Sequence, residues 1–407
     1  MTAGGGNRSE RHQRRGEGRS KLLRPARMLA HPANMFSDLP RPMLRTLRLA
    51  LLSVVSLVLL AASPVLGQTT GQPGEPVPDR LPAAEGVLDR MNERPSSLTQ
   101  RRPVATYSIV ARDSATGQMG VAVQSHWFSV GSVVPWAEAG VGAVATQSFV
   151  DPRYGPLGLE LMRHGRTAAD ALNALVSTDD GRAVRQVAMV DADGRVVVHT
   201  GENAIAEAGH QTGKQYSVQA NMMESATVWP AMAEAYETAE GDLAARLLAA
   251  LEAAQAEGGD IRGKQSAALV VVRSESTGQP WNDRLFDLRI EDHASPVEEL
   301  GRLLRMQRAY RNLNEGDGHV TAGDIEKAMQ SYRQAMDLLP DEATNGEAPF
   351  WVGITLADQG RVDDAIPYLK RAYEQDDNWA TLVGRLPEAG LLESEELAER
   401  LVEQMTE

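Results

Sequence analysis

The sequence predicts an α+β domain followed by a helical segment. From about residue 104 to residue 290, pairs of strand-like stretches are separated by pairs of helix-like stretches, a pattern typical of helices covering sheet faces. From Pro296 onward the chain has helical periodicity. A chain of 407 residues exceeds the size at which one hydrophobic core stops growing. We therefore expect two domains, at 104–295 and 296–407.

The first domain opens with a predicted β-hairpin. Tyr107, Ile109 and Ala111 alternate with the residues between them, residues 113–117 have turn chemistry, and residues 119–123 are apolar and favour a strand. A small hydroxyl residue therefore begins the first strand.

The remaining elements of this domain follow from periodicity. One helix is expected over 157–176, because its apolar residues fall largely on one helical face. The other expected elements are strands at 141–148, 186–190, 196–199, 216–220, 267–272 and 285–290, and helices at 226–237 and 243–257.

The helical segment contains a repeat. Ala328, Tyr332 and Ala335 recur as Ala365, Leu369 and Ala372, each 37 positions later. This spacing resembles the tetratricopeptide period of about 34 residues with a lengthened turn. Two units are fewer than an independent solenoid needs. We expect a small tetratricopeptide-like domain that packs on the first domain.

The first 67 residues predict an export signal. Residues 1–48 carry 11 Lys/Arg and 3 Asp/Glu, and the apolar run 49–62 is followed by small residues that suit cleavage after Gly67. The run is short for a membrane span, so the chain contacts a membrane only if the signal stays uncleaved. The expected location is periplasmic or extracellular.

Residues 68–103 are rich in proline, charge and polar groups, with a short helical patch at 86–91. They predict a disordered linker or pro-segment. The whole chain has a net charge of −14 and residues 1–48 carry +8, which leaves −22 for the rest. Such an acidic body argues against nucleic-acid binding. The absence of cysteine excludes disulfides and thiolate zinc sites.

Three segments resemble ligand-binding motifs, but each lacks a feature that its motif needs. Residues 258–265 nearly spell a phosphate loop but have Gln265 where a hydroxyl residue would hold magnesium. Residues 140–145 have dinucleotide-type glycine spacing without a helix after them. Residues 313–324 resemble a calcium loop with Leu313 at the first ligand position. We expect neither a metal nor a cofactor.

Motifs across 106 to about 306 resemble one bacterial family. They are TYSIVARD (106–113), GVAVQS (120–125), VGSVVPW (130–136), GVGAVATQ (140–147), PRYGPLGLELM (152–162), GHQTG (209–213), QANMM (219–223), GKQSAAL (263–269) and DLRIEDH (287–293). The family is the domain of unknown function 1028, which is grouped with the N-terminal-nucleophile hydrolases. The resemblance implies a four-layer αββα sandwich.

Thr106 is the first catalytic candidate. An N-terminal Thr can attack an amide with its hydroxyl while its own free α-amine acts as the base. Val104 and Ala105 before it resemble a small-residue cleavage site, and cleavage there would free the amine. The alternative is a β-branched residue that merely opens a strand. Ser108, on the same strand face, ranks second as nucleophile.

Further candidates lie at the end of the second strand and near the sheet. Gln124, Ser125 and His126 could face the start of the first strand, with His126 supplying a switchable charge where many such hydrolases use Lys. Lys264 could orient the site or cap a helix. Asn221 could donate to an oxyanion.

Three loop residues are candidates for substrate binding. Asp151 and Arg153 suit recognition of a polar substrate, and an internal ion pair is the alternative. His210 could donate to an oxyanion, and a structural role is the alternative.

The leading hypothesis is an exported amidohydrolase that uses a processed Thr106 on a small amide or peptide. The alternative is a non-catalytic ligand-binding sandwich whose helical domain engages a protein partner. A third hypothesis is a scaffold whose main activity lies in the groove of the C-terminal helical segment. Because interfaces between such domains are common, a homodimer is also expected.

Overall fold

The computed structural model describes residues 82–92, 104 and 106–407. The basic leader, the export signal and its cleavage after Gly67 lie outside the described residues. Within the described residues, no helix is both long enough and apolar enough to cross a membrane.

Among the described residues, six antiparallel strands form the larger sheet. Strand β1 lies near its middle, hydrogen-bonded to β2 on one side and to β8 on the other. The strands, in spatial order, are β10 (Arg284–Ile290), β9 (Ser266–Val272), β2 (Met119–Ser125), β1 (Thr106–Arg112), β8 (Tyr216–Asn221) and β7 (Gly209–Gly213). The predicted hairpin is confirmed, since β1 and β2 pair from Thr106 opposite Ser125 to Arg112 opposite Met119.

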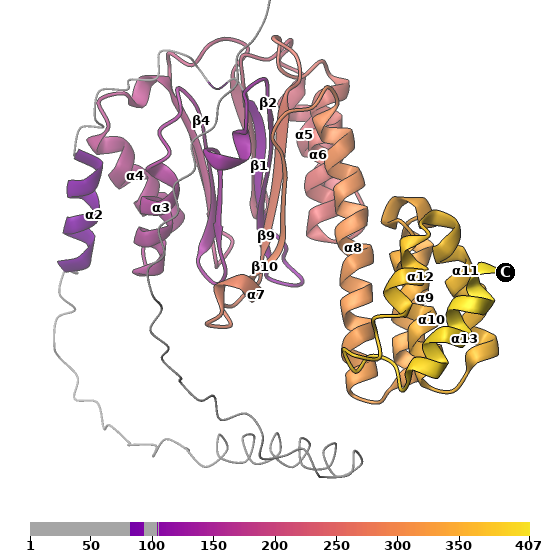
Figure 1. Ribbon diagram of the computed structural model, residues 1–407. Coiled ribbons are helices and arrows are strands. Elements are labelled where there is room, and N and C mark those ends of the chain that lie inside the picture. Colours follow the sequence, from indigo (N-terminus) through magenta and orange to yellow (C-terminus); the bar gives the residue numbers. More distant parts are fainter. Residues whose placement is uncertain (1–81, 93–103, 105) are drawn as a thin grey trace, which may run out of the picture. The chain divides into compact units, whose positions relative to one another are not determined.

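A smaller antiparallel sheet faces the first. Its described strands, in spatial order, are β3 (Pro135–Glu138), β4 (Gly142–Ser148), β5 (Arg185–Asp191) and β6 (Val196–Thr200). Figure 1 shows the two sheets side by side, with β4 and β1 on facing layers.

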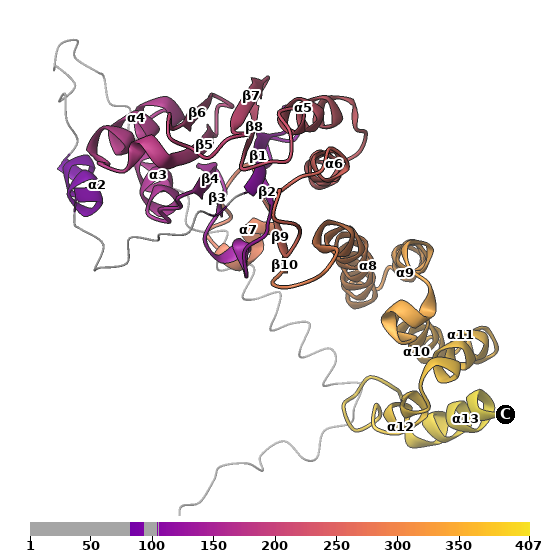
Figure 2. The same cartoon turned by 90° about the horizontal axis from the view of Figure 1, so that it is seen from above.

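Helices cover the outer face of each sheet (Figures 1 and 2). Against the smaller sheet lie α3 (Tyr154–Arg163) and α4 (Ala168–Thr178), and α2 (Pro82–Asn92) packs on these two helices. Against the larger sheet lie α5 (Val228–Thr238), α6 (Leu243–Ala256) and the first half of α8 (Pro296–Thr321). Short helical turns η1 (Val130–Ser132), η2 (Arg182–Val184) and α7 (Pro280–Asp283) connect elements of these layers.

The layers follow from strand alternation. In β1, Tyr107 and Ile109 join the apolar core beneath α5 and α6, whereas Val110 joins the core between the sheets. A third core fills the space between the smaller sheet and its helices, and includes Tyr154 and Leu172. Because side chains alternate across a strand, every second residue of β1 faces the other sheet.

One prediction about this domain was wrong. The single helix expected over 157–176 is two helices, because Gly165 adopts a left-handed φ of 83° and the Thr167 side chain caps α4 by accepting from the Asp170 N–H. The helical patch expected at 86–91 lies within α2, whose Val87 and Met91 are buried in the core with α3 and α4.

The C-terminal region is helical, as expected. It contains α9 (Ile325–Leu338), the turn η3 (Asp341–Thr344), α10 (Glu347–Asp358), α11 (Val362–Gln375), α12 (Asn378–Val383) and α13 (Glu395–Thr406). All six residues of the 37-residue repeat are buried in one apolar core. Helix α8 contributes to two cores, since Leu300 packs with the larger sheet and Leu313 joins the helical core.

Candidate functional site

Thr106 lies where three strands meet. It begins β1, and the pairing places Ser125 of β2 opposite it on one side and Asn221 of β8 on the other. All three side chains are fully buried. The structure therefore brings together three of the residues predicted from sequence, at one end of the larger sheet.

The hydrogen bonds of Thr106 involve both its hydroxyl and its carbonyl group. Its hydroxyl donates to the Val104 carbonyl oxygen at 2.9 Å and lies 3.2 Å from the Ser125 hydroxyl. Its carbonyl oxygen accepts from Gln147 Nε2 at 3.2 Å and Asn221 Nδ2 at 3.4 Å. These partners carry no charge, and within the described residues no lysine hydrogen-bonds to Thr106.

A buried polar network joins the two sheets beside Thr106. Ser108 donates to Gln147 Oε1 at 2.6 Å and accepts from Gln219 Nε2 at 2.6 Å. Gln147 Nε2 donates to Gln186 Oε1 at 2.7 Å, and Asn221 Nδ2 donates to the same oxygen at 3.0 Å. A buried hydrogen-bond network of this kind rigidifies a core. Ser108, predicted as a substitute nucleophile, is thus held inside it.

Sequence reasoning missed the three glutamines. Gln147, Gln186 and Gln219 each stand in a mainly buried strand, at a position whose side chain faces the opposite sheet. A polar residue at an inward-facing strand position was the signal that could have found them, because buried polar groups need partners.

Some buried polar atoms near Thr106 have no hydrogen-bond partner among the described residues. They are Ser148 Oγ and Asn221 Oδ1. Ser148 also has a left-handed φ of 70°, and Met222, directly after Asn221, has a φ of 57°. Such conformations cost about 1–3 kcal/mol each, and they cluster at functional sites. Strain and unsatisfied atoms therefore coincide at this end of β1.

Gln124 and His126 do not join this cluster. Gln124 faces the helix side of β2, beside Tyr107 of β1, and both of its buried amide atoms lack a partner in the described chain. Burial, and then the charge of Asp260, raises the pKa of Tyr107. The His126 side chain is exposed, and its backbone N–H donates to Asp260 Oδ2 at 2.8 Å.

The other predicted residues lie away from Thr106. Lys264 is exposed in the loop before β9. His210 lies in edge strand β7 and not in a loop, with Nδ1 2.9 Å from Thr200 Oγ1. Partial burial, and then His199, lowers the pKa of His210.

Asp151 and Arg153 form an internal ion pair, which was the alternative to a role in substrate binding. Arg153 donates to Asp151 Oδ2 at 2.7 Å and to the Met91 carbonyl oxygen at 2.8 Å, which ties α3 to the end of α2. Arg185 lies 3.8 Å from the same Asp151 oxygen. The geometry fits a structural role.

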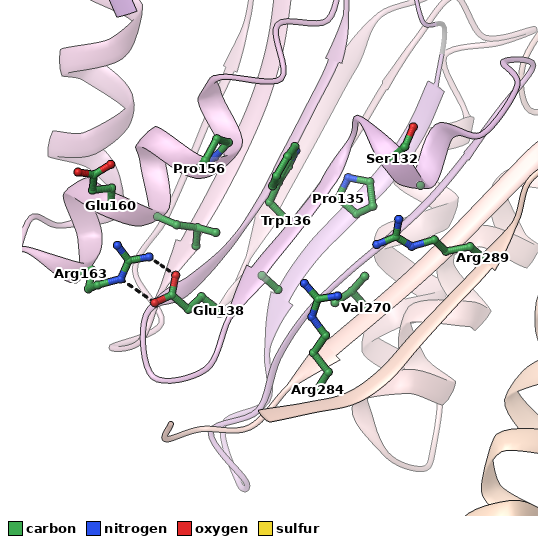
Figure 3. A pocket seen from close by; sticks show the side chains of 13 residues that line it. Ser132, Pro135, Trp136, Glu138, Pro156, Glu160, Arg163, Val270, Arg284 and Arg289 are labelled. Atoms are coloured by element: carbon green, nitrogen blue, oxygen red, sulfur yellow. Dashed lines mark hydrogen bonds and ion pairs between the residues drawn. The ribbon is translucent and has the colours of Figure 1, made fainter. Parts of the chain in front are cut away.

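A cavity of about 490 Å³ opens at another place, between β3, α3 and β10 (Figure 3). Trp136 lines it, and Arg163 there pairs with Glu138. Arg284 and Arg289 also line it, and both bind Asp287. None of the predicted site residues is among those that line this cavity.

Comparison with known proteins identifies relatives of the first domain. Residues 106–300 match the model of DUF1028, a family of unknown function. The chain is also similar to a protein of that family from Silicibacter pomeroyi with a known crystal structure. The two are 31% identical over 50% of this chain and 88% of that chain, with a TM-score of 0.44. No protein with a curated description matches this chain.

Proposed function

This chain belongs to the family of unknown function DUF1028, and we propose that it is an exported amidohydrolase of the N-terminal-nucleophile class. Its nucleophile is the hydroxyl of Thr106, which becomes active once the Ala105–Thr106 bond is hydrolysed. The substrate is a small amide or peptide, and the reaction uses neither a metal nor a cofactor. The proposed location is periplasmic or extracellular.

The position of Thr106 beside the strained Ser148 is the main support for this proposal. Thr106 begins a central strand between Ser125 and Asn221, and the strained, partly unsatisfied Ser148 bonds to the residue two positions before it. A fold stores strain and buried unsatisfied groups where another requirement outweighs stability. The two facing sheets with helices outside them also agree with the αββα layering of this hydrolase class.

The proposed chemistry needs a free amine. Hydrolysis of the Ala105–Thr106 bond adds water across it and leaves a new carboxylate on Ala105 and an α-amine on Thr106. That amine takes the hydroxyl proton as Thr106 Oγ1 attacks the substrate carbonyl carbon. The substrate C–N bond breaks, the leaving amine takes the proton, and the acyl ester on Thr106 is then hydrolysed by water.

Asn221 is the proposed donor to the oxyanion that forms in these steps. Its Nδ2 already reaches the Thr106 carbonyl oxygen, and its Oδ1 has no partner among the described residues. An uncharged donor held in a dry site stabilises developing negative charge strongly. Ser125, whose hydroxyl lies 3.2 Å from that of Thr106, is the proposed proton relay.

The test is intact-mass analysis of the purified full chain and of three variants. The wild type and Thr106→Ser should both be cut before residue 106, whereas Thr106→Ala should stay whole. Thr212→Ala, which changes an exposed threonine of β7, is the matched control and should be cut normally. Cleavage of Thr106→Ala at the wild-type rate would show that another protease or residue makes the cut.

A ligand-binding sandwich without catalysis is the second candidate. In the uncut chain Thr106 is fully buried and has no free amine, while the cavity at Trp136 is open to a ligand (Figure 3). A folded chain that keeps the 105–106 linkage would favour this reading. Arg289→Ala would then weaken ligand binding, whereas Thr106→Ala would leave it unchanged.

For the helical region we propose a tetratricopeptide-like domain that engages a protein partner. Its helix pairs and buried repeat residues support this. A groove of about 860 Å³, lined by Arg333, Tyr368 and Arg371, lies along α9 and α11. Reversing the charge at Arg333 should weaken capture of a defined partner without affecting cleavage before Thr106. A homodimer remains a proposal that a sedimentation measurement tests.

A further inference from the structure

Val104 forms an isolated antiparallel β-bridge with Ser148. Its N–H donates to the Ser148 carbonyl oxygen at 2.6 Å, and its carbonyl oxygen accepts from the Ser148 N–H at 3.1 Å. Its side chain is fully buried in the apolar core between the sheets. One residue thus makes a complete antiparallel pair and fills an apolar position, two residues before the proposed nucleophile.

We propose that the place of Val104 is the subsite for the second residue on the acyl side of the substrate. The proposal rests on the proposed function, because it assumes that Thr106 attacks substrates. The bond before Thr106 is the first amide in this site, so a later substrate carbonyl takes the position of the Ala105 carbonyl. The substrate class is an extended peptide with a small residue before the scissile bond and a valine-like residue before that.

The physical reason is the state of Ser148 after cleavage. Once Val104 leaves its place after cleavage, the Ser148 N–H and carbonyl oxygen both lose their partner at a buried position. Unpaired buried backbone groups are costly, and an incoming extended backbone satisfies both of them at once. The subsite therefore recognises a peptide backbone, and not only a side chain.

Side-chain selectivity follows from the core around Val104. The position lies in a cluster made mainly of valines and alanines that includes Val110, Val130 and Val134. A charged side chain placed there would lose its hydration without gaining a partner. Ser148 Oγ, which has no partner among the described residues, offers one further hydrogen bond to the substrate.

The test measures binding of acetyl-Pro-Val-Ala to the full chain after cleavage before Thr106, by calorimetry. Wild-type chain that cuts itself is used directly. In parallel, residues 102–105 are replaced by Ile-Glu-Gly-Arg, so that a site-specific protease exposes Thr106 whether or not the chain can cut itself. Binding is thus measured independently of catalysis.

Three control peptides separate backbone from side-chain recognition. Methylation of the valine nitrogen removes the donor to Ser148 and should weaken binding about tenfold or more. Replacement of valine by alanine should weaken it about tenfold. Replacement by aspartate should weaken it by roughly a hundredfold or more.

The outcomes distinguish the two proposals. Selective binding by the protease-cut chain, while protein purified from its own cells keeps Ala105 joined to Thr106, supports the subsite and overturns the proposed function. Equal binding of all four peptides, or no binding by either cut form, overturns the subsite even if the wild type cuts itself.

Discussion

The hydroxyl groups of Thr106 and Ser125 lie 3.2 Å apart across the β1–β2 pair, and both side chains are fully buried. Register alone sets this relationship, because the two residues are directly opposite in the hairpin. Ser125 is thus the nearest side-chain hydroxyl that could relay a proton from Thr106.

Ser125→Ala should slow cleavage before Thr106 by roughly tenfold to a hundredfold, because proton transfer in the transition state loses one partner. A mass-spectrometric time course of newly made chain measures the rate. Ser132→Ala, in an exposed turn, is the control and should cut at the wild-type rate. An unchanged rate for Ser125→Ala would remove Ser125 from the mechanism.

Ser148→Gly should raise the free energy of unfolding by about 1 kcal/mol, because glycine adopts a φ of 70° without the strain that serine bears there. Both backbone hydrogen bonds to Val104 stay available. Urea denaturation of the Thr106→Ala background, which is expected to stay uncut, measures the difference. A destabilised glycine variant would mean that the serine side chain contributes more than its backbone costs.

Gln147→Leu should lower the free energy of unfolding by about 2–4 kcal/mol, because Ser108, Gln186 and the Thr106 carbonyl group each lose one buried hydrogen-bond partner. Gln211→Leu, at an exposed position of β7, is the control and should change stability by less than about 0.5 kcal/mol. Equal effects of the two changes would contradict the view that this network holds the sheets together.

We expect the ionisation of Asp179 to make the free energy of unfolding depend on pH. Burial disfavours its charge, but the hydrogen bond and charge of Arg185, with bonds from Gly181 and Tyr154, hold its pKa below the ordinary value. The pKa of Asp179 is lower in the folded chain than in the unfolded chain. The ionised carboxylate therefore stabilises the fold at a pH above the pKa of the unfolded chain, and this stabilisation is lost as the pH falls through the pKa of the folded chain.

Asp179→Asn should therefore lower the free energy of unfolding by about 3 kcal/mol at pH 7 and by progressively less below about pH 4. Urea denaturation between pH 2 and pH 7 follows the difference between the two proteins. A difference that stayed constant with pH would show that the carboxylate charge is not what stabilises this pair.

The sequence was sufficient to predict the local elements whose pattern is strong. The β1–β2 hairpin, the strands around the turn after Asp191 and the helices α5 and α6 all have clear periodicity. The strands β3 and β7 were missed because they are short, with glycine at both ends of β7. The break at Gly165 was missed because the apolar face continues across it.

Only the site residues that lie in recognisable sequence motifs could be predicted. Thr106, Ser125 and Asn221 were found, and the hairpin pairing accounts for two of them. The glutamine network and the Trp136 cavity depend on how the two sheets face each other, and no local pattern encodes that long-range arrangement. His210 was expected in a loop because a five-residue strand with exposed polar residues resembles one.

The central claim is that Thr106 becomes an N-terminus, and the most direct measurement is the N-terminal sequence of the folded protein purified from its own cells. If Thr106 is the nucleophile, this sequence begins Thr-Tyr-Ser-Ile. A homogeneous folded chain in which Ala105 is still joined to Thr106 would contradict it.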